Sequence, residues 1–258
     1  ADRHICLPPT VAELHLQTSH NQTMDEFGQR IRVLHRFSLS VALQTLSVNV
    51  GLTLPEIAIL PRTLRRLTLK RIDCSAQDMA LIAWPPHLTH LAIDIWTVGD
   101  DYTVTGLPQS ATHLRIDTVG VDDHCRHASP DSVRIDKVCW PVHLRQLSLW
   151  SKASLRSVCL PSTLTHLALS SSTRFDAPLC ASLTHLNFDR HSDRFDILSV
   201  IAPCNNLLVL GLPQRVLEWL QTSQLNALCM QSLLHMRIGT RVVPVSRTAD
   251  GKLDALAL

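Results

Sequence analysis

The sequence predicts a strand-rich α/β solenoid, in which short coils stack on one another and share one parallel β-sheet. A ten-residue phrase, L-P-x-x-L-x-x-L-x-L, returns along most of the 258 residues, and such a short unit buries its apolar face only by stacking on its copies. The last leucines of the phrase alternate with polar residues, which is the period of a half-buried strand. From Leu60 on, copies start 19 to 24 residues apart, except for the 33 residues between Leu107 and Trp140. The return segment of each coil is therefore too short for a full helix and should be extended or 3₁₀.

Copies of the phrase can be followed along the chain, so we expect residues 1–258 to form a single solenoid. The proline of the phrase suits this fold, because it fixes φ and precedes the hydrogen-bonded part of the strand. The copies occupy 7–16, a degenerate 39–48, clear copies beginning at Leu60, Trp84 and Leu107, tight copies beginning at Trp140, Leu160 and Leu179, and 203–212.

Three stretches interrupt the pattern. Residues 18–38 should be a helical insertion or cap, because residues 23–26 have capping-box spacing and apolar residues then recur at helical spacing. Residues 117–138 should be an irregular insertion between two copies. Residues 213–258 should be degenerate C-terminal repeats or a cap, with 241–243 as a closing strand.

Composition narrows the classes of protein to consider. Hydrophobic residues make up 45% of the chain and aromatic residues 4%, which favours a folded, leucine-built core over disorder. A formal net charge of +2 gives no global field to recruit nucleic acid or an anionic membrane. No stretch is apolar for the 18 residues of a membrane span, and the N-terminus has no signal pattern. We therefore expect a soluble chain with no membrane partner.

The eight cysteines favour an intracellular location. None forms a C-x-x-C pair, and several stand beside the first residue of a copy, as Cys139 does before Trp140 and Cys159 before Leu160. We interpret them as small buried hydrophobic residues in a reducing compartment, most simply the cytoplasm, although import into an organelle stays open.

The repeat phrase resembles known families. Residues 160–169 read L-P-S-T-L-T-H-L-A-L, which is similar to the leucine-rich repeat superfamily and, with F-D-A-P at 175–178, to its short FNIP-like variant. Residues 84–91 and 179–188 match the first half of that variant. Phe175 and Phe195 stand where F-N-Q-P is expected, and the asparagine is absent at both. The resemblance implies a leucine-rich repeat arc, with the sheet on its concave side and a mostly non-helical convex side, that binds other macromolecules and catalyses no reaction.

Four histidines share one slot, immediately before the second leucine of the L-x-x-L-x-L segment: His90, His113, His166 and His185. Arg66 and Gln146 hold the same slot in other copies. Neighbouring strands lie about 4.8 Å apart, so we expect two adjacent histidine pairs on the solvent face of the sheet. Two ligands do not complete a zinc shell. We therefore predict a stacked, partner-binding ladder and no metal site.

Two further side chains should share this face. Arg115 stands between the last two leucines of its copy, and Trp150 stands after them. Both residue types are enriched at binding hot spots, although a flanking loop covering Trp150 is an equally good interpretation. The predicted partner-binding residues are Arg66, His90, His113, Arg115, Gln146, Trp150, His166 and His185.

No catalytic or cofactor motif is found. The chain has eight glycines and neither a G-x-S-x-G elbow nor a phosphate-binding loop. Residues 122–127 gather Asp, His and Cys side chains, but a solvated loop is the default interpretation because a structural zinc site needs a second segment. We therefore expect no enzyme, cofactor or metal, and a non-enzymatic protein–protein interaction module with a protein partner. The alternative is a structural subunit permanently embedded in a larger assembly such as a ribonucleoprotein. Nucleic acid would be a partner only within such an assembly.

Overall fold

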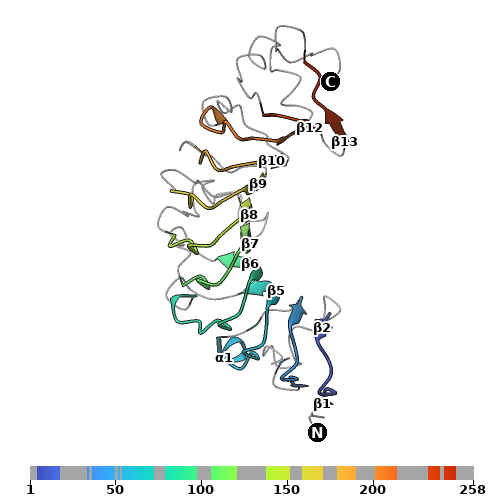
Figure 1. The fold of residues 1–258 in the computed structure, drawn as a ribbon. Coiled ribbons are helices and arrows are strands. Elements are labelled where there is room, and N and C mark those ends of the chain that lie inside the picture. Colours follow the sequence, from blue (N-terminus) through green and yellow to red (C-terminus); the bar gives the residue numbers. More distant parts are fainter. Residues whose placement is uncertain are drawn as a thin grey trace.

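The computed structural model is an arc of stacked coils with its strands along the inner side (Figure 1). It describes residues 5–17, 34, 37–49, 52, 54–72, 79–97, 106–120, 138–151, 159–170, 179–189, 201–213, 232–238 and 241–247. The predicted fold class is confirmed: the described part is rich in strand and holds little helix.

Ten parallel strands and one antiparallel strand form a single sheet. The parallel strands are β2 (Glu13–Leu16), β4 (Thr45–Val48), β5 (Arg66–Ile72), β6 (His90–Thr97), β7 (His113–Gly120), β8 (Gln146–Ser151), β9 (His166–Ser170), β10 (His185–Asp189), β11 (Val209–Leu212) and β12 (His235–Ile238). β13 (Arg241–Pro244) pairs antiparallel with β12, as a closing strand. The order in the sheet follows the chain from β2 to β13, so each coil contacts its sequence neighbours.

Within the described residues, three short elements with assigned bounds lie outside this sheet. β1 (Ile5–Cys6) and β3 (Phe37–Ser38) form a two-stranded parallel sheet. The helix α1 (Leu54–Ala58) lies between β4 and β5. Within the described residues, no helix has both the length and the apolar character to cross a membrane.

The leucines of the phrase build the interior. In the coil of β9, Leu164, Leu167 and Leu169 are at most 2% exposed, because alternate strand residues point into the coil and Leu164 fills the turn that precedes the strand. The backbone N–H of Leu164 donates to the carbonyl of Pro161 at 3.0 Å. The same turn closes on the proline carbonyl in five other coils, at Pro8, Pro61, Pro85, Pro108 and Pro141.

Adjacent coils are joined by a recurring backbone contact. The N–H groups of Thr165 and His166 both donate to the carbonyl of Arg145, at 2.9 Å each. Side-chain hydroxyls add to it: Ser110 donates to the carbonyl of Leu88 and Ser182 to that of Leu164, each at 2.8 Å. These contacts hold equivalent residues of successive coils in register across the sheet.

The stretches predicted to interrupt the repeat are only partly described. The helix predicted in 18–38 lies mostly outside the described residues, but Leu34 is buried and its N–H donates to Glu56 Oε1 at 3.1 Å. β7 extends to Gly120, so its last four residues take up the start of the predicted insertion at 117–138. Residues 121–137 lie outside the described part, and these domain boundaries stay predictions.

The predicted burial of the cysteines is wrong for three of the five described ones. Cys6, Cys139 and Cys159 are exposed, whereas Cys180 is half-buried and Cys204 is buried. Cys180 and Cys204 occupy the proline slot, while Cys139 and Cys159 precede the first leucine slot and point outward. Burial, and then the nearby Cys180, raises the pKa of the Cys204 thiol to about 12, so this thiol is protonated and unreactive.

Candidate partner-binding face

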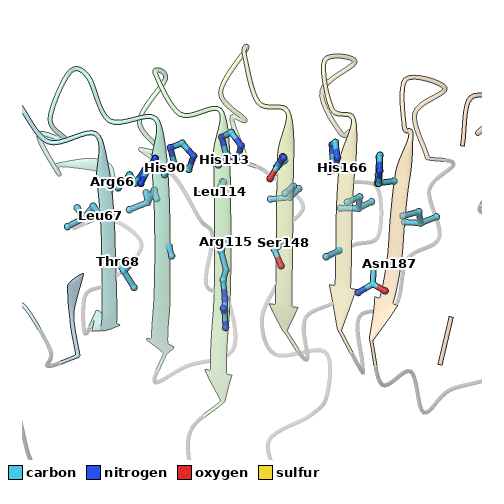
Figure 2. A pocket seen from close by; sticks show the side chains of 18 of the residues that line it. Arg66, Leu67, Thr68, His90, His113, Leu114, Arg115, Ser148, His166 and Asn187 are labelled. Carbon is cyan, nitrogen blue, oxygen red and sulfur yellow. The ribbon is translucent and has the colours of Figure 1, made fainter. Parts of the chain in front are cut away.

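A groove of about 650 Å³ runs along the concave face. Seven of the eight predicted residues line it, and Trp150 lies outside its lining. Figure 2 shows Arg66, His90, His113 and His166 near the start of their strands, with Arg115 and Asn187 farther along. Small residues such as Ala92, Ala168 and Gly211 are also part of the lining.

One row of side chains crosses six neighbouring strands, and we call it the histidine row. The register pairs Arg66 with His90, His90 with His113, His113 with Gln146, Gln146 with His166, and His166 with His185. The adjacency predicted from the repeat slot is therefore present. The strand spacing and the shared slot together create the row.

The histidine rings form two stacks. The ring centroids of His90 and His113 are 4.0 Å apart with 12° between the ring planes. Those of His166 and His185 are 4.1 Å apart with an angle of 9°. Parallel rings direct their Nε2 atoms side by side, and convergence on one metal ion would need tilted rings.

A threonine precedes and orients each histidine. The distance from threonine Oγ1 to histidine Nδ1 is 2.9 Å for Thr89 and His90, and 2.8 Å for Thr112 and His113. It is 2.9 Å in both later copies, at His166 and His185. This second layer of polar contacts was missed at the sequence level, although the recurring Thr-His dipeptide is its signal.

The threonine contacts assign the histidine tautomer. Thr89 Oγ1 donates to the carbonyl of Arg65 at 3.1 Å, and a hydroxyl has only one proton. We therefore assign the proton between threonine and histidine to Nδ1, which leaves Nε2 as an acceptor in the neutral ring. The other three threonines donate in the same way, at 3.1 to 3.2 Å.

Burial and neighbouring positive groups favour the neutral form of three of these rings. Burial, then His113 and Arg66, lowers the pKa of His90. Burial, then Arg145 and Arg66, lowers the pKa of His113. Burial, then His185 and His113, lowers the pKa of His166. At neutral pH His90, His113 and His166 therefore present imidazole acceptors beside permanent arginine charges.

Trp150 is held against the sheet by neighbours on the same face. Its Nε1 donates to Ser148 Oγ at 2.8 Å, and Arg115 Cζ lies 5.1 Å from the ring centroid. Arg115 Nη2 is also 3.7 Å from Asp117 Oδ2, with the Arg115 side chain 51% exposed. The indole is half-buried, and its described contacts come from sheet residues.

A pair of carboxyl groups lies near the other end of these strands. Asp94 and Asp117 are register partners. Burial raises the pKa of both, and Asp94 raises that of Asp117 further, while Arg115 lowers both and Lys70 lowers that of Asp94. With Lys70 and Arg115 beside them, this end of the face carries both signs of charge.

The described residues contain no group of three or more His, Cys, Asp and Glu side chains that could hold a metal ion. The loop 122–127, singled out for its ligand-type residues, lies outside the described part. What the described face offers is a row of aromatic, guanidinium and amide groups suited to recognition.

The chain was compared with known protein families, curated sequences and solved structures. No protein-family model and no curated protein sequence matches the chain. A solved structure, described as CroV588, a novel circular LRR protein, is similar with a TM-score of 0.46 and 17% identity, over 90% of this chain and 37% of that one. The chain thus spans well under half of that protein. In the chain itself, coils with the L-x-x-L-x-L phrase or a close variant of it contribute neighbouring strands to one parallel sheet.

Proposed function

We propose that this chain is a non-enzymatic protein–protein interaction module that holds a protein partner on its concave face. The observation that carries the proposal is the groove of about 650 Å³ lined by the histidine row. It combines exposed Arg66 and Arg115 with half-buried histidines on a rigid sheet. A rigid surface of this kind loses little conformational entropy on binding.

Arg115 and Trp150 are the proposed anchors. Arginine and tryptophan are the residue types that most often dominate binding energy. Here the guanidinium lies over the indole, so a partner that covers one covers both. The proposed family subtype is FNIP-like, and its support is the T-H-L phrase at 89–91, 112–114, 165–167 and 184–186.

The test is affinity purification from the native source with wild-type bait and two double variants. Arg115→Ala/Trp150→Ala should lose the partner, since two hot-spot truncations each weaken affinity by about 30-fold or more. The control, Arg62→Ala/His143→Ala, changes exposed residues in turns between strands and should retain it. Equal capture by all three baits would show that Arg115 and Trp150 do not contribute to partner binding.

One observation favours the alternative, a structural subunit embedded in a larger assembly such as a ribonucleoprotein. Leu14 and Leu16 in β2 are half-buried, whereas the equivalent Leu167 and Leu169 are 2% and 1% exposed. An edge that leaves core leucines partly open suits a permanent neighbour. Size-exclusion of the native protein tests this: co-elution with a large particle supports the subunit, and a peak of monomer size supports the module. Fractionation tests the proposed intracellular location.

A further inference from the structure

The segment of the histidine row around His90 and His113 carries positive charge that no carboxylate of the described residues in the row offsets. Arg66 lines the groove and is exposed, and it is the register partner of His90. Arg145 is outside the groove lining, but it immediately precedes β8, is exposed, and lies close enough to His113 to lower the pKa of that ring. From β5 to β10 the described part of the row contains no carboxylate; Glu13 holds the same slot two strands away from Arg66.

The other charged groups on these strands do not neutralise this segment. Among the described side chains farther along β5, β6 and β7, the charged ones are Lys70, Asp94, Arg115 and Asp117, which are two cations and two carboxyl groups. The second histidine pair, His166 and His185, has the same threonine contacts, and no arginine lowers the pKa of His166. The first pair is therefore the point where positive charge and stacked imidazole rings coincide.

We propose that Arg66, His90, His113 and Arg145 recognise an acidic, extended segment of the partner protein. This inference rests on the proposed function and specifies the chemistry of the partner. Charge complementarity selects the occupant: carboxylates pair with guanidinium groups, and a carboxylate between them accepts a hydrogen bond from the Nε2–H of a charged imidazole.

The spacing of the row fits alternate residues of an extended peptide. Three strand steps separate Arg66 from the start of β8, which is about 14 Å at about 4.8 Å per step. An extended chain advances about 3.4 Å per residue, and every second side chain points the same way. Acidic residues at i, i+2 and i+4 would therefore face Arg66, the histidine pair and Arg145.

The direct test measures fluorescence anisotropy of a labelled peptide of about nine residues with Glu at alternate positions. Wild-type protein should bind it, and Arg66→Glu/Arg145→Glu should weaken binding at least ~10-fold. Glu13 and Thr45 occupy the slot of Arg66 in other coils, so the substitution is compatible with the fold. The matched control, Arg62→Glu/Arg241→Glu, makes the same charge change at exposed positions outside the groove and should bind like wild type.

Proton uptake supplies a second readout. An anion beside the imidazoles raises their pKa on binding, so affinity should increase as the pH falls from about 7.5 to about 5.5, where Glu stays ionised. His90→Gln/His113→Gln should flatten this dependence, and His166→Gln/His185→Gln should leave it intact. Gln146 already stands in this slot, which makes glutamine a conservative replacement.

Several results would overturn the inference. One is that a peptide with Gln in place of Glu binds as tightly as the Glu peptide. Another is that the control variant Arg62→Glu/Arg241→Glu loses as much affinity as Arg66→Glu/Arg145→Glu. A third is that an RNA oligonucleotide of similar charge binds more tightly than the Glu peptide. If the native partner still depends on Arg115 and Trp150 while no acidic peptide binds, this inference fails and the proposed function stands. If the native partner does not depend on Arg115 and Trp150 and no acidic peptide binds, both this inference and the proposed function fail.

Discussion

Two tryptophans occupy the first slot of their coils, and their indole N–H groups have different surroundings. Trp84 Nε1 donates to the carbonyl of Gly106 in the next coil at 2.6 Å. Trp140 Nε1 is buried without a hydrogen-bond partner in the described part of the chain. Trp84→Phe should therefore lower the free energy of unfolding by about 1–3 kcal/mol more than Trp140→Phe does. Urea denaturation of both variants checks this, and equal losses would contradict it.

The histidine row makes stability depend on pH. The pKa values of His90, His113 and His166 are lowered in the folded chain, so below about pH 6.5 the unfolded chain binds more protons. The free energy of unfolding should therefore fall as the pH drops through about 6.5. His90→Gln/His113→Gln should reduce this loss. Unfolding curves between about pH 7.5 and 5.5 measure it, and an unchanged slope would show that these rings titrate as in the unfolded chain.

At the scale of the coil, Gly106 shows where one backbone position limits the turn before β7. Its φ is +67°, and a Cβ built there would lie 2.5 Å from the Met79 carbonyl oxygen and 2.7 Å from Ala80 Cα. Gly106→Ala should cost about 1–3 kcal/mol of unfolding free energy. Gly211→Ala is the matched control, because its Cβ would meet the movable side-chain amide of Asn187. A smaller loss for Gly106→Ala than for Gly211→Ala would refute this account of the turn.

The strand register could be predicted from the sequence, whereas several contacts could not. The position of a residue within the repeat phrase predicted its neighbours on adjacent strands. This is because leucines at equivalent positions of successive copies must stack on one another in the shared interior. β12 was missed because its coil has Met230 in the proline slot and Met236 and Ile238 in the leucine slots. The bond from the Leu34 N–H to Glu56 and the proximity of Arg145 to His113 depend on tertiary geometry that no repeat pattern encodes.

For the whole molecule, stability should be close to a sum over coils and their interfaces, since the sheet order follows the chain. Leu167→Ala removes a side chain that is 2% exposed in a central coil and should cost about 2–5 kcal/mol. Leu14→Ala in the half-buried edge strand β2 should cost less. Denaturation of the two variants compares them, and an equal or greater cost at Leu14 would show that this edge is as tightly packed as the centre.

The claim that the concave face holds the partner can be tested most directly by histidine acylation with and without the bound partner, followed by peptide mass spectrometry. His90, His113, His166 and His185 line the groove, whereas His87 and His143 are exposed in turns outside it. We expect the partner to protect at least one of the two stacked pairs while His87 and His143 remain modified to the same extent. Protection of the turn histidines alone, with the histidine row still fully reactive, would contradict the account.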